Sequence, residues 1–145
     1  MLTTIRDDMI EALEDLAVFK AVDVWKGELP DLKLQAKSLP SAYVLLHSGA
    51  FAPRRTIPPA EAQLGMSWDV LVFFGGLGSS TAATGAGYAL IEAVCARSSS
   101  GGLTGLKTAG GQLWPTDLEI VSAADGVIVY RIGFAIEAGI PDLEG

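Results

Sequence analysis

The chain has 145 residues, half of them apolar and 19% charged, with a formal net charge of -7. This length fits one domain that can bury a sizeable core without disulfides or metals. The acidic balance argues against a protein that coats duplex nucleic acid, because displacing counterions from phosphates requires a basic surface. The apolar content is high for a small domain, so we expect one domain over residues 1–145 with buried subunit contacts.

The first residues do not have the pattern of a secretory signal. Such a signal needs a basic segment followed by an apolar one, whereas Asp7 and Asp8 already make the start of the chain acidic. The sequence also contains no run of about 18 apolar residues that could span a membrane. Cys95 is the only cysteine, so it cannot form an intramolecular disulfide. We expect a protein that is kept or assembled in the cytoplasm.

The first predicted element is an amphipathic helix. Apolar residues recur at steps of three and four, and most acidic residues lie away from that stripe. Thr4 followed by Asp7 resembles the capping box that marks a helix N-terminus. The apolar stripe consists of Leu2, Ile5, Met9, Ala12, Leu13 and Leu16.

Two strands and an arm are expected next. A short strand around Val22–Trp25 is followed by Gly27–Pro30, which breaks it. Ala42–His47 is apolar at successive positions, which is typical of a central strand covered on both faces or at a subunit contact, and Gly49 is expected to end it. The segment Phe51–Gln63 carries three prolines, which interrupt regular strand pairing, so we expect an exposed arm there.

The next predicted strand has two different faces, because side chains alternate along a strand. The wholly apolar face consists of Met66, Trp68, Val70, Val72 and Phe74. The half-polar face consists of Ser67, Asp69, Leu71 and Phe73. We expect this second face to lie against a neighbouring subunit.

A glycine-rich segment joins this strand to a second predicted helix. Gly76–Ser80 lacks the lysine or further glycine that phosphate-binding loops carry at a fixed offset, and no Gly-Lys-Ser/Thr occurs in the chain. We therefore expect a mobile loop from Gly75 to about Gly85, then a packing helix. A small-ligand or nucleotide-binding α/β domain that uses the Gly75–Gly87 loop is the alternative. After the helix, Ser98–Gly111 is expected to be a second loose linker.

The chain closes with a predicted β-hairpin. A strand is expected around Leu118–Ser122, and Asp125-Gly126 is a strong signal for a hairpin turn. The last strand, from Val127 to about Ala138, has one unbroken apolar face, which specifies its register. The order of elements predicts an α+β fold, in which a mostly antiparallel sheet carries two helices packed on one face and a C-terminal β-hairpin.

Residues that could carry catalysis or bind a metal are scarce. His47 is the only histidine, and one cysteine cannot build a structural zinc site. A Ser-His-Asp arrangement could be formed with Asp69, but the Gly-x-Ser-x-Gly motif does not occur. A single histidine at a strand end is more often a hydrogen-bonded structural residue. We therefore expect no catalytic residues, no metal and no cofactor, and we do not expect an enzyme.

Several segments together resemble a known family of phage proteins. They are the acidic N-terminal helix, Leu39–Leu46, Trp68–Val72, Gly85–Val94 and Asp125–Tyr130 leading into the final strand. The chain resembles, over nearly its whole length, the Mu-like phage tail-protein family that is usually associated with the tail terminator, a small tail-completion protein.

The resemblance implies a structural function. Tail terminators of this type assemble as a hexameric ring at the end of the polymerised tail tube, stop its growth and present a surface for head joining. The implied partners are further copies of the chain, the tail tube protein and a head-tail connector or neck protein. No membrane and no specific nucleic acid are implied, since DNA passes through the ring lumen. The implied location is the virion tail, after assembly in the bacterial host cytoplasm.

A closed ring requires a heterologous interface, in which one patch meets a different patch on the next subunit. One side is expected on the proline-containing arm and the other on the half-polar sheet face. Leu77, the large apolar residue of the glycine-rich loop, is a further candidate. The expected interface residues are Phe51, Arg54, Arg55, Asp69, Phe73 and Leu77.

Overall fold

A computed structural model describes residues 1–25, 39–53, 62–75, 80–124 and 126–140. The described helices are α1 (Leu2–Asp15), α3 (Ser80–Cys95) and the short 3-10 helix η2 (Ser98–Ser100). The described strands are β1 (Ala21–Val24), β2 (Ser41–Phe51), β3 (Ala62–Gly75), β4 (Lys107–Thr108), β5 (Gly111–Gln112), β6 (Trp114–Ala124) and β7 (Val127–Ile140).

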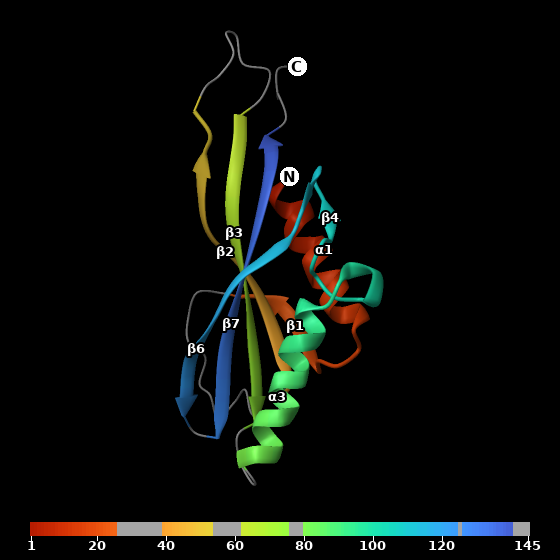
Figure 1. The fold of residues 1–145 in the computed structure, drawn as a ribbon, viewed down its shortest axis with the longest axis vertical. Coiled ribbons are helices and arrows are strands. Elements are labelled where there is room, and N and C mark those ends of the chain that lie inside the picture. The colour runs from red at the N-terminus through yellow and green to blue at the C-terminus, as the bar shows by residue number, and fades with distance from the viewer. Residues whose placement is uncertain (26–38, 54–61, 76–79, 125, 141–145) are drawn as a thin grey trace.

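Five strands form one strongly twisted sheet in the order β1-β2-β3-β7-β6. The pairing of β1 with β2 is parallel, and the other three pairings are antiparallel. Figure 1 shows the strands crossing near the middle of the molecule, as the twist of long strands requires. Strands β4 and β5 pair separately beside α1. The predicted α+β fold with a mostly antiparallel sheet and a C-terminal hairpin is confirmed.

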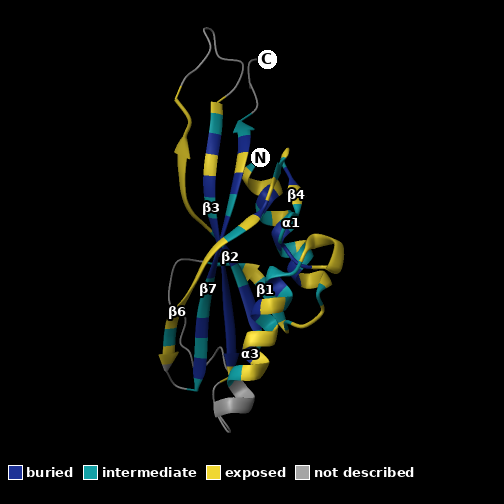
Figure 2. Ribbon diagram, viewed as in Figure 1, coloured by how far each residue is buried: buried dark blue, intermediate teal, exposed yellow. Residues whose placement is uncertain are grey.

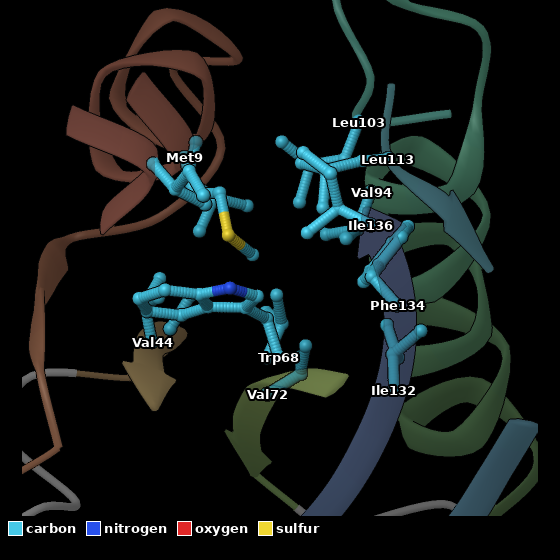
Figure 3. Close-up of a cluster of buried hydrophobic side chains, with 14 of the residues drawn as sticks. Met9, Val44, Trp68, Val72, Val94, Leu103, Leu113, Ile132, Phe134 and Ile136 are labelled. Atoms are coloured by element: carbon cyan, nitrogen blue, oxygen red, sulfur yellow. The ribbon is translucent and has the colours of Figure 1, made fainter. Parts of the chain in front are cut away.

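The main core lies between the two helices and one face of the sheet. We call the face that carries Met66, Trp68, Val70 and Val72 the helix-side face, and the face that carries Asp69, Leu71 and Phe73 the second face. Ile5, Met9 and Leu13 of α1 and Ile91 and Val94 of α3 pack in the same cluster as the helix-side residues. Figure 3 shows Met9 above Trp68, with Val94 and Phe134 beside them. The prediction that both helices cover one face is therefore confirmed.

Helix α1 begins earlier than the capping-box pattern predicts. Met1 is the residue before the first turn, and the structure shows no side-chain hydrogen bond capping this end. The backbone N–H of Ile5 already donates to the Met1 carbonyl at 3.0 Å, so Thr4 lies inside the helix and does not cap it. The predicted apolar stripe is confirmed at its centre, where Ile5, Met9 and Leu13 are fully buried.

Strand β2 does not end at Gly49, as predicted, but continues to Phe51. The start of β3 pairs with this end, so that Ala50 lies opposite Gly65 and Phe51 opposite Leu64. The pairing with β3 satisfies the backbone hydrogen-bonding groups beyond Gly49, so the strand continues past this glycine. The ends of the expected arm are therefore paired strand, and its middle, residues 54–61, lies outside the described residues.

Helix α3 begins at Ser80, five residues before the predicted start at Gly85. The prediction of a loop up to Gly85 is therefore wrong from Ser80 onward, and residues 76–79 lie outside the described residues. Gly87 belongs to the helix interior, where a Cβ atom would overlap the ring of Phe74 on β3. This glycine lets the helix backbone approach the sheet closely, which is a packing function and not a phosphate-binding one.

We expect Gly87→Ala to lower the free energy of unfolding by about 1–3 kcal/mol, because overpacking displaces buried rings. Gly85→Ala on the same helix is the matched control, since a Cβ there meets nothing within 4 Å. That control should raise stability by about 0.5–1 kcal/mol through helix propensity alone. Urea denaturation of both variants checks this, and a stabilised Gly87→Ala protein would contradict the close packing.

The segment after α3 is anchored, although the sequence predicted a loose linker from Ser98 to Gly111. Leu103 within this segment and Leu113 just after it are fully buried in the main core. The Leu103 N–H donates to the Val94 carbonyl at 2.8 Å, and the Gly105 N–H donates to the Leu113 carbonyl at 2.7 Å. The prediction of a loose linker is wrong because these hydrogen bonds and the two buried leucines fix the segment in place. The sequence gives no sign of this, since the segment has no regular apolar period.

Candidate subunit interface

The structure places three of the six predicted interface residues. Phe51 lies at the end of β2 with an exposed fraction of 62%. Asp69 and Phe73, by contrast, are only 1% and 0% exposed, so the expectation that they form an exposed sheet face is wrong. The other three residues, Arg54, Arg55 and Leu77, lie outside the described residues.

Phe73 is buried by aromatic residues of its own chain. Its ring centroid lies 5.8 Å from that of Trp25 and 5.3 Å from that of Tyr43. Trp25 and Tyr43 also contact each other edge to face, with centroids 5.6 Å apart. The cluster also contains Leu71, Val127 and Val129, with Leu39 packed against it. This second core explains why half of the β3 residues on the second face are apolar without a subunit contact.

Asp69 is buried because two side chains satisfy its carboxylate. Arg131 on β7 donates through Nη1 to Oδ1 at 3.0 Å, and Nδ1 of His47 lies 2.7 Å from Oδ2. The His47 side chain keeps 53% of its surface exposed. The expectation that His47 is a hydrogen-bonded structural residue is therefore confirmed.

Arg131 joins this buried carboxylate to two carboxylates of the neighbouring strand β6. Its Nε donates to Glu119 at 3.1 Å, and its Nη2 donates to Asp117. The hydrogen bond to Asp117 is the main reason that the pKa of Arg131 lies above its usual value. Gly133 provides the space for this arrangement, since a Cβ there would overlap the Asp117 carboxylate. Four strands of the sheet thus meet in one polar network.

The same network lowers the pKa of the Asp117 carboxyl, chiefly through the hydrogen bond from Arg131. A lowered folded pKa stabilises the fold above the ordinary aspartate range, and this contribution is lost as the pH falls through the folded pKa. We expect Asp117→Asn to flatten the acid side of the stability profile slightly, because the carboxylate is exposed and screened. Urea midpoints between pH 7 and pH 2 test this. Identical slopes for both proteins would contradict the pairing.

Strand β6 is the most conspicuous uncovered apolar element. It is the last strand in the sheet order, and it carries four of the nine large exposed hydrophobic residues among the described ones. These residues are Trp114 (63%), Leu118 (51%), Ile120 (55%) and Val121 (45%). Figure 2 shows the exposed stretches along this strand. An uncovered edge strand with apolar side chains is a template for pairing with another chain.

The register shows which face these residues occupy. Leu118 lies opposite Ile132 and Ile120 opposite Tyr130, so both belong to the helix-side face, where they remain about half exposed. Asp117 lies opposite Gly133 and Glu119 opposite Arg131, on the second face. The sequence predicts a strand around Leu118–Ser122, but none of its residues is among the predicted interface residues. The alternation of Asp117, Leu118, Glu119 and Ile120 was the available signal.

A second open edge lies on the other side of the sheet. Strand β1 pairs with β2 only from Ser41 to Val44, and the described residues place no strand outside the remaining part of β2. This part carries Leu46 (37% exposed) and Phe51. Beside it, small side chains of β2, β3 and β7 leave a shallow hollow of about 400 Å³. Its lining includes Ser48, Ala50, Gly65, Ser67 and Ala135.

The described part of the chain offers little for other kinds of site. No group of three or more metal-ligating side chains occurs among the described residues. Within the same ranges, no helix combines the length and apolarity needed to cross a membrane. Cys95 is half-buried, and burial raises the pKa of its thiol, so the reactive thiolate is disfavoured.

Comparisons with known proteins give a distant likeness of fold. No protein-family model and no curated protein matches the sequence. Among solved structures, the chain is similar to one chain in the virion of a native gene transfer agent (GTA) particle. The TM-score is 0.53 and the sequence identity is 14%, and the match covers 96% of this chain and 97% of that chain. At this identity the likeness shows that the two chains share a fold over nearly their whole lengths.

Proposed function

We propose that this protein is a structural component of a phage-like tail, where it acts as the tail terminator. In this function it caps the tail tube as a hexameric ring, ends tail polymerisation and forms the surface for head joining. The observation that carries the proposal is the fold shared with a virion component over nearly the full length of both chains. The sequence resemblance to Mu-like tail terminators selects this function among the structural ones.

The described surface supports an assembling protein. Most of the large exposed hydrophobic residues on strands lie on two uncovered edges, β6 and the outer part of β2. A chain that works alone usually covers or charges such edges, because they pair with other chains. A subunit that must associate with neighbours can keep them open.

The proposed partners follow from this function. They are further copies of the chain, the tail tube protein on one side of the ring and a head-tail connector or neck protein on the other. The ring would be assembled in the host cytoplasm and remain in the virion tail. It would bind no specific nucleic acid, and DNA would pass through its lumen. Phe51, Arg54, Arg55 and Leu77 stay proposed contact residues, whereas Asp69 and Phe73 are withdrawn because they are buried.

The direct test is removal of the gene from the phage or particle that encodes it. We expect electron microscopy to show tails of uncontrolled length and heads without tails, because tube growth would have no stop and no joining surface. Expression of the wild-type protein from a plasmid is the control and should restore a narrow length distribution. Normal tails attached to heads in the absence of the protein would overturn the proposal.

A further inference from the structure

We infer that β6 of one copy pairs with the open part of β2 in a second copy, so that the two sheets become continuous. This pairing would be the subunit interface of the proposed ring. Only the closure of the paired copies into a ring rests on the proposed function. The pairing itself follows from the two uncovered edges of the described sheet.

Strand direction permits this pairing between copies in the same orientation. Strand β2 runs antiparallel to β3, β3 antiparallel to β7, and β7 antiparallel to β6. It follows that β2 and β6, on opposite edges of one sheet, also run in opposite directions. When the next copy is placed edge to edge with the same orientation, its β2 meets β6 as an antiparallel neighbour. Such a head-to-tail contact is heterologous, and it generates either a closed ring or a filament.

Irregularities in both strands limit the pairing to short regular stretches. In β6 the register shifts between Pro115 and Asp117 and again between Ile120 and Ser122, which leaves Asp117–Ile120 regular. In β2 the register shifts between Leu46 and Ser48, which leaves Ser48–Phe51 regular. Two stretches of equal length thus face outward. Bulges near the ends of an edge strand also prevent pairing that continues without limit.

The apolar side chains match when the two faces are kept continuous. Leu118 and Ile120 lie on the helix-side face of β6. Phe51 lies opposite Leu64 of the main core and therefore on the helix-side face of β2. An antiparallel register that preserves the faces can place Leu118 opposite Phe51 and Ile120 opposite Gly49, where a side chain is absent. Cross-strand pairs of large apolar residues stabilise a sheet in this geometry.

Charge selects this partner over a symmetric pairing of two β6 strands. The only charged residues of β6 are Asp117 and Glu119, both exposed on the second face. Two β6 strands side by side would bring four carboxylates together with only the two Arg131 side chains that already pair with them. The excess of like charge on facing strands is destabilising. Strand β2 carries no acidic residue and has His47 as its only ionisable side chain near this edge. The acidic strand therefore fits β2 of a second copy better than a second β6.

Cross-linking between two variants tests the pairing. Both variants carry Cys95→Ala, and one adds Glu119→Cys on β6 while the other adds Ala50→Cys on β2. These changes leave the exposed apolar side chains in place. A short bismaleimide is added to each variant alone and to an equal mixture. The inference predicts a cross-linked dimer in the mixture only, since a heterologous contact brings residues 119 and 50 of different copies together.

Two results would overturn the inference. One is a cross-linked dimer with the Glu119→Cys variant alone, which would show symmetric β6 pairing. The other is the absence of a mixed dimer at every concentration tested, including those at which light scattering shows assembly. Failure of the proposed function is a separate result. Normal tails in the gene-deleted particle would overturn the tail-terminator function, whereas a mixed cross-linked dimer would still show that β6 pairs with β2.

A pair of point variants supplies an independent measurement. Ile120→Lys places a charge in the middle of the regular β6 stretch, whereas Val18→Lys changes an exposed hydrophobic residue after α1. We expect the first variant to shift the concentration for half-assembly, measured by light scattering, upward by at least tenfold, and the second to leave it unchanged. Equal behaviour of the two variants would contradict a contact at β6.

Discussion

Replacing Phe73 with alanine is expected to lower the free energy of unfolding by about 3–5 kcal/mol, the usual cost of truncating a buried aromatic residue. Phe73 is fully buried, and its ring contacts those of Trp25 and Tyr43 at centroid distances of 5.8 and 5.3 Å. Truncation would leave a cavity on the second face and remove both aromatic contacts. Urea denaturation of the dilute protein, followed by Trp fluorescence, measures the change.

Phe51→Ala is the matched control for this prediction. It removes the same side chain from a position that is 62% exposed, so the stability of the isolated chain should change by no more than about 0.5 kcal/mol. Its effect should instead be seen in assembly, where Phe51 is a proposed contact. If Phe73→Ala left the stability of the isolated chain unchanged, the second core would be wrong and the original interface expectation would regain support.

The contrast between these two phenylalanines shows where sequence reasoning reaches its limit. Alternation along β3 correctly separates its two faces, because the side-chain period of a strand is fixed. It does not show what covers each face. Phe73 is covered by Trp25 and Tyr43, which lie 48 and 30 positions earlier in the chain. Such long-range packing leaves no local pattern, so the sequence alone predicts an interface where this face is in fact buried.

Elements with a strong period were predicted correctly. The stripe of Ile5, Met9 and Leu13 and the alternation of Ile132, Phe134 and Ile136 all lead to buried core residues. Elements held by single contacts were missed, as for Leu103 and Leu113, which anchor a glycine-rich segment without any period. A period in the sequence shows that several residues share one environment, whereas a single buried leucine produces no period.

The candidate interface was missed for a different reason. The order of the strands in the sheet decides which strand lies at an edge. Strand β7 has β3 on one side and β6 on the other, so β6 is the last strand. The sequence of β6 has the alternation of a half-buried strand, with apolar residues at Leu118 and Ile120. Only the three-dimensional arrangement shows that Leu118 and Ile120 stay about half exposed on the helix-side face.

Replacing Arg131 with methionine is expected to lower the free energy of unfolding by about 3–5 kcal/mol, because removing one partner of a buried ion pair leaves the other charge uncompensated. Asp69 would keep its contact with His47 at 2.7 Å but would lose the guanidinium that donates to its other oxygen. Methionine preserves most of the apolar stem of arginine, so the loss reports on charge and hydrogen bonding more than on volume.

Two further variants separate the buried pair from its exposed partners. Glu119→Gln removes an ion pair whose carboxylate side chain is 63% exposed, and it should change stability by less than about 1 kcal/mol. Asp69→Asn in the Arg131→Met background removes the uncompensated buried charge, so it should recover part of the lost stability. The coupling energy from the complete double-mutant cycle should then be clearly different from zero.

Additive effects of Asp69→Asn and Arg131→Met would contradict the network, since independent residues far apart show no coupling. A cost of Glu119→Gln equal to that of Arg131→Met would place the main interaction at the exposed end instead. The expected order, with a large loss at Arg131, partial recovery with Asp69→Asn and a small loss at Glu119, follows from burial. Because this network connects β2 and β6, the same Arg131 variant should also weaken assembly if both edges form the interface between copies.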